Sequence, residues 1–467
     1  MSLYNCAVPR NLVRILSLFL TIVLAVFLSL VLPGYSELKK ASTAKTYLQA
    51  AEHYQNAAQR LPWRADLYEL SGHAYYHARE YVQADAAYRK AFQQDALSPD
   101  GWVAWGDVNY LQDDLPRATE IWEQALVQKN ASEHLYSRLA EIYQSRGEHA
   151  KAAETLQKYV SAHPEDAAAH YRLGLLLTLS APDRAAAELL RASELDPALD
   201  PAVQTLRTAL NLAAVNDSDS ARLVIVGRGL GLVGEWGLAR PAFEEATQLD
   251  EQDAEAWAWL GEADQQAGET GVEQLERAFH LNPASPTVRG LRGLYFQRAG
   301  NFREAVIEFQ TAAALEPGNQ MWYVSLGESH AGLGDLIRAL EAYQKATTVA
   351  PEDPDSWRLL ATFCAQNNVN IRDVGVPAAQ KAVVLAGEDS ASLDLLGWLL
   401  TLDARYEEAR RMLGRALELD PQNGAAHLHL GMLYLQTNDR ASAYEHFVKA
   451  RDLGNSESAM VLSQYFP

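Results

Sequence analysis

Apolar and small residues recur three and four positions apart along most of the chain, in short runs separated by glycine or proline. Residues with this spacing share one face of an α-helix, so each run predicts a helix that must bury one stripe against a neighbour. One stretch shows the full pattern, with large, small and turn-forming residues at Tyr323, Leu326, Gly327, Gly334, Ala339, Tyr343, Ala346 and Pro351. It predicts two helices that meet at Gly334 and end before Pro351.

Small residues in this stretch have a packing role that differs from that of the large ones. Gly327 and Ala339 remove bulk where the two helices would cross, and Tyr323 and Tyr343 fill the remaining space. Gly334 lies between the helices, where a left-handed backbone is easily adopted by glycine. The stretch therefore predicts an antiparallel helix pair.

The same pattern returns many times. It recurs at Leu393, Leu396, Gly397, Ala404, Ala409, Leu413, Ala416 and Pro421, and again at His427, Leu430, Gly431, Tyr434, Asn438, Ala443, Phe447 and Ala450. This pattern resembles the tetratricopeptide repeat, a helix–turn–helix unit of about 34 residues. About eleven such units follow Ala65, one after another, which makes the match specific. The resemblance implies an all-α fold, a right-handed superhelical solenoid of antiparallel helix pairs.

The N-terminal segment differs from the repeats. Residues Ile15 to Leu32 carry no charge, and with Leu12 and Val13 they give about 20 residues, enough for a helix that crosses a bilayer. We expect a short tail over 1–11, a transmembrane helix over 12–32, and a juxtamembrane helix with a half repeat over 33–64. The alternative is a cleaved secretory signal, but the nearest small-x-small site, at Ser42 and Ala44, lies far downstream.

Charges beside this segment hardly decide its orientation, because two arginines precede it and three lysines follow it (Arg10, Arg14, Lys39, Lys40 and Lys45). We favour a single-pass protein with the repeat array outside the cytoplasm, since long domains cross a membrane largely regardless of charge.

Two interruptions divide the predicted array. Repeats are expected over 65–198 and 220–457, separated by an irregular extra helix over 199–219 that either stacks on its neighbours or acts as a hinge. The unit at Trp357 departs from the pattern at Asn367 and Asn368, with an extended loop to Pro377 that is either an insertion or a weaker unit. A capping helix is expected over 458–467, since a terminal repeat would otherwise expose its core face.

Composition excludes some functions. Lys and Arg total 40 against 60 Asp and Glu, a net charge of -20, which argues against nucleic acid as a partner because phosphate binding needs a basic face. The two cysteines, Cys6 and Cys364, lie on opposite sides of the apolar segment, so a disulfide between them is not expected.

Signals of chemistry are few. Gly229-Leu-Gly231-Leu-Val-Gly234 follows an apolar stretch and matches a dinucleotide-binding fingerprint, with Asp250 near the required distance. We interpret it as one more repeat, completed by Gly227, Ala239, Phe243 and Ala246. His73 and His77 lie four apart on a helix, but no third metal ligand is evident nearby. We therefore expect no catalytic, cofactor or metal site.

The family resemblance implies a concave groove, lined by first helices, that holds segments of other proteins. We expect six residues of the first units to face this groove: Asp66, Glu69, His73, Asp100, Asp107 and Glu141. Their acidity favours a basic or polar protein segment, although exposed carboxylates also serve as a solvated surface. The lysines and asparagines with which chaperone-binding family members hold an acidic tail are missing, so we predict no binding of such tails.

These observations predict a membrane-tethered scaffold that assembles a protein complex and is not an enzyme. Two alternatives stay open at this point. One is a non-catalytic accessory subunit of a membrane or cell-envelope enzyme, for example in glycosyl transfer or secretion, because only short termini lie outside the repeats. The other is a secreted solenoid, if the N-terminal segment is removed.

Overall fold

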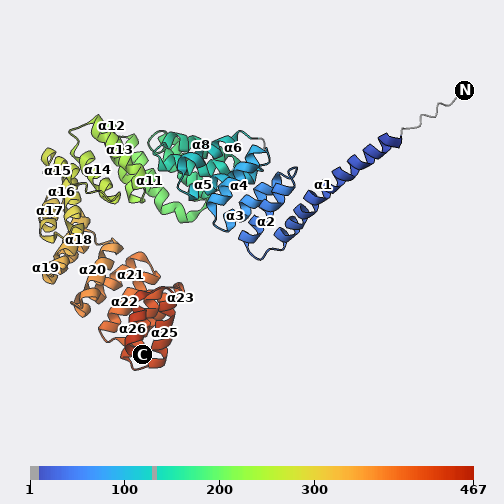
Figure 1. Cartoon of the computed structure of the whole chain (residues 1–467). Coiled ribbons are helices and arrows are strands. Elements are labelled where there is room, and N and C mark those ends of the chain that lie inside the picture. The colour runs from blue at the N-terminus through green and yellow to red at the C-terminus, as the bar shows by residue number, and fades with distance from the viewer. Residues whose placement is uncertain (1–9, 129–133, 467) are drawn as a thin grey trace. The chain divides into compact units, whose positions relative to one another are not determined.

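The computed structural model describes residues 10–128 and 134–466, and within them every regular element is a helix (Figure 1). The expected tail over 1–11 lies mostly outside the described residues. The chain divides into two compact units, Met1–Leu210 and Asn211–Pro467. The boundary between them falls inside a single helix, α11 (Asp200–Ala214), in the segment where the sequence predicts an irregular extra helix.

The first unit is a series of antiparallel helix pairs, in which each helix packs against the next along the chain. Its helices are α1 (Arg10–Ser42), α2 (Tyr47–Arg60), α3 (Asp66–His77), α4 (Tyr81–Gln93), α5 (Pro99–Leu111), α6 (Leu115–Leu126), α7 (His134–Ser145), α8 (His149–Ala162), α9 (Ala167–Leu177), α10 (Pro182–Leu195) and the short 3₁₀ turn η1 (Pro197–Leu199).

The second unit continues the same architecture, and its first helices also contact one another from pair to pair. Its helices are α12 (Asp219–Leu232), α13 (Trp236–Leu249), α14 (Ala254–Gln266), α15 (Val272–Leu281), α16 (Pro286–Arg298), α17 (Phe302–Leu315), α18 (Gln320–Gly332), α19 (Leu336–Val349), α20 (Pro354–Asn367), the π-helical turn η2 (Ile371–Gly375), α21 (Val376–Ala386), α22 (Ser390–Leu402), α23 (Tyr406–Leu419), α24 (Gly424–Gln436), α25 (Arg440–Asp452) and the final α26 (Ser456–Tyr465).

Glycines on first helices let the second helix of each pair approach closely. A Cβ on Gly327 would lie 2.8 Å from the ring of Tyr343, a residue sixteen positions later on α19. The same contact between a first-helix glycine and a large side chain recurs at Gly72 and Tyr88, Gly106 and Trp122, Gly227 and Phe243, Gly293 and Phe309, Gly397 and Leu413, and Gly431 and Phe447. The predicted packing of small against large residues is confirmed.

Local signals in the sequence also fix where the helices begin and end. Gly334, between α18 and α19, has a φ of 75°, the left-handed conformation predicted for it. Side chains of Asn319 and Asn423 cap α18 and α24 by accepting hydrogen bonds from the backbone N–H groups of Met321 and Ala426. Such caps satisfy donors that the helix itself leaves free.

The segment that resembles a dinucleotide-binding loop is part of this array. Residues Asp219–Leu232 form α12, so the apolar stretch before Gly229 is helical and not a strand. Gly227 packs against Phe243 and Gly231 against Trp236, both within the same helix pair. The interpretation of this segment as a repeat is confirmed.

The unit at Trp357 differs from the expectation of an extended loop. Between α20 and α21 the chain forms the π-helical turn η2, with left-handed residues at Asn368 and Asn370. Gly375 ends this turn against the side chains of Cys364 and Leu399, and a Cβ there would lie 3.0 Å from each. The insertion is therefore a packed turn, because its apolar residues join the core of the second unit.

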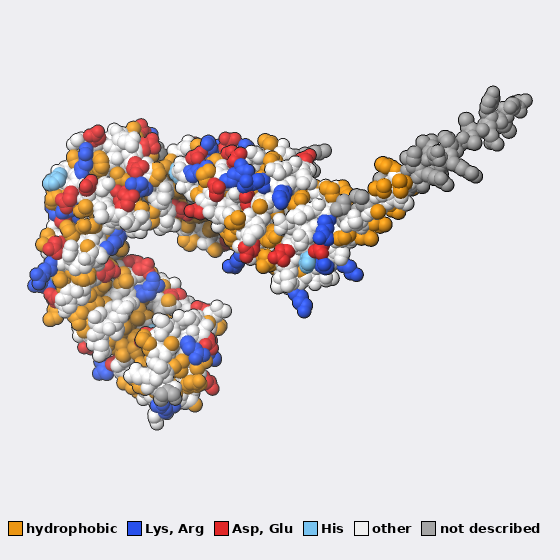
Figure 2. Space-filling model, in the orientation of Figure 1, with side chains coloured by type: hydrophobic (Ala, Val, Ile, Leu, Met, Phe, Trp, Pro, Cys, Tyr) orange, Lys and Arg blue, Asp and Glu red, His pale blue; other side chains and the backbone are white. Residues whose placement is uncertain are grey.

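The N-terminal helix α1 is one unbroken helix that serves two purposes. Its last turns form the first helix of a pair with α2, where Val31 shares a core cluster with Ala57 and Leu61. Gly34 permits this contact, since a Cβ there would lie 2.6 Å from Cγ of Leu61. The described side chains of α1 between positions 18 and 28 are exposed and largely apolar (Figure 2). This helix is long and apolar enough to cross a membrane.

Candidate functional site

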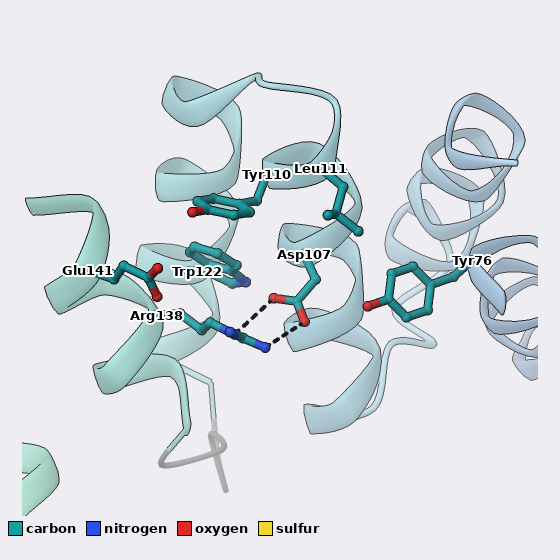
Figure 3. Close-up of a pocket in the computed structure, with 7 residues that line it drawn as sticks. All are labelled: Tyr76, Asp107, Tyr110, Leu111, Trp122, Arg138 and Glu141. Atoms are coloured by element: carbon teal, nitrogen blue, oxygen red, sulfur yellow. Dashed lines mark hydrogen bonds and ion pairs between the residues drawn. The ribbon is translucent and has the colours of Figure 1, made fainter. Parts of the chain in front are cut away.

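A cavity of about 130 Å³ opens on the first helices of three consecutive pairs in the first unit (Figure 3). Its walls come from α3, α5, α6 and α7. The residues that line it are Tyr76, Asp107, Tyr110, Leu111, Trp122, Arg138 and Glu141. The cavity thus lies on the face where the family resemblance implies partner binding.

The cavity has an aromatic floor and an accessible rim. Trp122 is buried against Gly106, and its indole N–H donates a hydrogen bond to the carbonyl of Val103 at 3.1 Å. The ring of Tyr110 lies beside it, with centroids 6.1 Å apart. Tyr110 and Leu111 are 39% and 49% exposed, so both are available to a partner side chain.

Charged groups occupy one side of this cavity. The guanidinium of Arg138 pairs with the carboxylate of Asp107, Nε to Oδ1 at 3.2 Å and Nη2 to Oδ2 at 3.3 Å. Burial raises the pKa of Asp107; Arg138 acts in the opposite direction, and Glu141 adds to the rise. Two carboxylates face one guanidinium, which leaves the site with a net negative charge suited to a cationic group.

The structure brings only two of the six predicted groove residues, Asp107 and Glu141, to this cavity. Asp66 instead pairs with Arg64, with Oδ2 and Nη2 2.7 Å apart, and the adjacent carboxylate oxygen accepts from Nε. Asp100 is exposed near the start of α5. The predicted residues therefore have different surroundings despite their similar positions in the repeats.

Glu69 and His73 are engaged inside the fold. The carboxylate of Glu69 accepts hydrogen bonds from the backbone N–H and the hydroxyl of Ser98, at 2.7 and 2.5 Å. Ser98 is the N-cap of α5, so Glu69 joins two successive first helices. Burial by itself would raise the pKa of Glu69, but the bonds from His73 and Ser98 outweigh it and lower the pKa. His73 also contacts the hydroxyl of Tyr88 at 2.9 Å.

Sequence reasoning missed the uncharged and basic members of the cavity. Tyr110 follows Asp107 by three positions, and Arg138 precedes Glu141 by three, so each shares a helix face with a residue that was named. Tyr76 likewise follows His73 by three. The helical spacing was therefore a usable signal for these residues, although the predicted groove residues were all acidic apart from His73.

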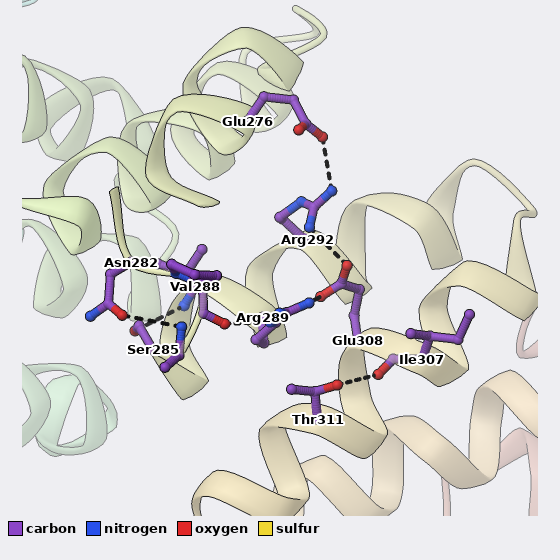
Figure 4. A network of polar contacts seen from close by, with 11 residues as sticks. Glu276, Asn282, Ser285, Val288, Arg289, Arg292, Ile307, Glu308 and Thr311 are labelled. Carbon is purple, nitrogen blue, oxygen red and sulfur yellow. Dashed lines mark hydrogen bonds and ion pairs between the residues drawn. The ribbon is translucent and has the colours of Figure 1, made fainter. Parts of the chain in front are cut away.

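Other polar clusters have structural partners. In the second unit, Glu308 accepts hydrogen bonds from Arg289 and Arg292 at 2.9 and 2.8 Å, and Arg292 also reaches Glu276 (Figure 4). The guanidinium of Arg292 lies 3.9 Å from the ring centroid of Phe279. Arg292 and Glu308 are nearly buried, Glu276 is 45% exposed, and the network is balanced in charge, so it joins α15, α16 and α17 as a structural link. The described residues contain no group of three or more side chains able to hold a metal ion.

Comparison with known proteins agrees with the repeat pattern and the fold. Models of the tetratricopeptide repeat match residues 137–200, 291–356, 324–368 and 400–462. The chain is a tetratricopeptide-repeat protein. At this general level, this tetratricopeptide-repeat protein is a scaffold for protein–protein interaction.

Relatives of this tetratricopeptide-repeat protein include a CTR9 homolog of Arabidopsis thaliana, 25% identical over 241 residues, which are 48% of this chain and 22% of that protein. The BBSome complex member BBS4 homolog of Drosophila melanogaster is 26% identical over 175 residues, 36% of each chain. Superkiller complex protein 3 of Homo sapiens is 28% identical over 130 residues, 26% of this chain and 8% of that protein. The chain thus spans well under two thirds of the length of these relatives.

Two solved structures align with most of this tetratricopeptide-repeat protein, both with TM-scores below 0.5. The Cut9 and Hcn1 hetero-tetramer structure matches 94% of this chain and 96% of the other, with 14% identity and a TM-score of 0.44. Yeast Tom70 matches 94% of each chain, with 15% identity and a TM-score of 0.38.

Proposed function

We propose that this protein is a membrane-tethered scaffold that assembles a protein complex through the first-helix face of its repeats, without catalysis of its own. The observation that carries the proposal is the continuity of α1. The helix passes without a break from an exposed apolar segment into the first repeat, where Val31 and Gly34 pack against Leu61. An anchor built this way holds the array directly at the bilayer.

The cavity at Asp107 supports a basic or polar protein segment as the partner. Its aromatic walls, Tyr110 and Trp122, offer contact area. Its two carboxylates, Asp107 and Glu141, outnumber its one guanidinium. A lysine or arginine of a partner would pair with Glu141 and stack on an aromatic ring, an arrangement that stabilises cations. Relatives whose names place them in the BBSome and Superkiller complexes support assembly as the role.

Site-specific crosslinking in cells tests partner binding. A photoreactive amino acid at Tyr110, on first helix α5, is expected to trap a partner protein. The matched control is Leu190 on second helix α10, because the two residues are 39% and 40% exposed. Asp107→Asn combined with Glu141→Gln should weaken the trapped band. Equal crosslinking from both positions, or no effect of the double variant, would contradict the proposed site.

Membrane attachment is tested separately. The protein is expected to stay in the membrane pellet after alkaline carbonate extraction, with an N-terminal sequence that still contains the apolar segment. Protease added to intact cells should then digest the array if it lies outside the cytoplasm. Recovery of a soluble form that lacks residues 12–32 would replace the tethered scaffold with a secreted one.

A further inference from the structure

We propose that the loop between α2 and α3, residues 61–65, is a lipid-contact surface, with Trp63 in the interfacial layer of the bilayer. The inference rests on the proposed membrane tether and specifies how the first repeat sits against the membrane. The partner of this surface is the bilayer itself. This follows from the position, Val31, at which α1 begins to pack against α2 and can no longer be surrounded by lipid.

The first support is an aromatic pair that joins the anchor to the repeats. The rings of Phe27 on α1 and Trp63 on the loop are stacked, with centroids 6.2 Å apart and planes inclined by 12°. Phe27 is 52% exposed and Trp63 is 54% exposed, so this pair faces the surroundings of the protein. Phe27 lies in the apolar part of Leu18–Ser42, the one candidate membrane span in the described residues.

The length of α1 fixes the depth of this pair. From Val31 onward the helix packs against α2, so lipid can surround it only before that point. A hydrocarbon core of about 30 Å needs about 20 helical residues, and counting back from Leu30 by that number reaches Asn11, near the start of the helix at Arg10. Phe27 is then about 5 Å inside the hydrocarbon boundary, because each residue rises about 1.5 Å.

Trp63 must therefore lie close to that boundary, where tryptophan is enriched in membrane proteins because its ring is apolar and its N–H is polar. Neighbouring side chains suit the same layer. Leu32 and Tyr35 of α1 are exposed, and Arg60, in the last turn of α2, is exposed toward the same end. An arginine at this level can meet lipid phosphate, which makes the loop a surface for headgroups as well as for the apolar edge.

Environment-sensitive labels on the full-length protein in phospholipid vesicles test this inference. Trp63→Cys and Arg60→Cys variants are labelled with a fluorophore, in a chain where Cys6→Ser removes one native thiol and the buried Cys364 does not react. The control is Val82→Cys, exposed on α4 at the opposite end of the adjacent helix pair. Circular dichroism establishes that each labelled variant is folded.

Lipids with bromine or spin labels near the headgroup should quench the labels at positions 63 and 60 more than the label at position 82, by a ratio on the order of twofold. Equal quenching at all three positions, in protein that sediments with vesicles, overturns the inference and leaves the tether standing. Failure to sediment with vesicles overturns both. Quenching at position 63 without any at position 60 limits the surface to Trp63 and contradicts the role given to Arg60.

Discussion

Replacing Gly106 by alanine is expected to destabilise one repeat locally, although alanine is the better helix former. A Cβ at this position would lie 1.8 Å from Nε1 of Trp122 and 2.2 Å from its Cδ1. The indole cannot simply rotate away, because it is buried and its N–H is bonded to the carbonyl of Val103. The substitution must therefore displace either the ring or helix α6.

The expected magnitude combines three terms. Overpacking a dense core costs about 1–3 kcal/mol. Losing the hydrogen bond from Trp122 adds about 1 kcal/mol. The higher helix propensity of alanine offsets about 1 kcal/mol of this loss of stability. The net loss of stability is about 2 kcal/mol, which corresponds to an about thirtyfold larger equilibrium constant for local opening.

Hydrogen exchange of the full-length protein measures this change where it occurs, since repeats respond mainly to their neighbours. Peptides from α5 and α6 should exchange faster in Gly106→Ala, while peptides from α23 should not change. The control is Gly414→Ala, inside α23, where a Cβ meets nothing within 4 Å. That variant should slow exchange, with a gain of about 0.5–1 kcal/mol. Slower exchange around α5 in Gly106→Ala would refute the packing argument.

Three further predictions concern the second unit. Glu308→Ala should destabilise it by about 3–5 kcal/mol in urea unfolding, because Arg289 and the buried guanidinium of Arg292 lose their shared buried partner and Arg292 keeps only the half-exposed Glu276; the exposed Glu304→Ala should change little. Burial lowers the pKa of His446 to about 4, against about 6.5 when unfolded, so stability present above about pH 6.5 is lost as the pH falls toward 4. Hydrogen exchange of α24 and α25 at pH 7 and 5 measures that loss, and no change would contradict it. Burial raises the pKa of Cys364 to about 11, so alkylation should follow unfolding of the second unit and not precede it.

Much of the fold was readable from the sequence because the decisive contacts are local. Gly327 and Tyr343 are sixteen residues apart, so the pair that sets the crossing of two helices lies within one repeat and recurs with it. The π-helical turn η2 could not be predicted from local contacts in the sequence. Its place depends on Gly375 packing against Leu399, a residue of the next pair, and on left-handed conformations at two asparagines.

The candidate site was less predictable, because charges act across repeats and not within them. Glu69 and Asp107 are both acidic residues on first helices, yet one caps the next helix through Ser98 and the other holds Arg138 beside a cavity. Which of these happens depends on the side chain that the following repeat supplies about thirty residues later. The net negative charge of the sequence therefore suggested more carboxylates available to a partner on the first-helix face than the structure provides.

The same reasoning explains why the N-terminal helix could be recognised as apolar from composition, whereas the point where it begins to pack against α2 could not be read from composition alone. The apolar run ends at Leu32, whereas packing against α2 begins at Val31 and continues through Gly34 to Ala41. The start of this packing is thus set by Leu61, the residue that ends α2, and not by hydropathy. If the tether holds, a change that loosens this contact, such as Gly34→Val against Leu61, would free the first repeat from the anchor while leaving the apolar segment intact.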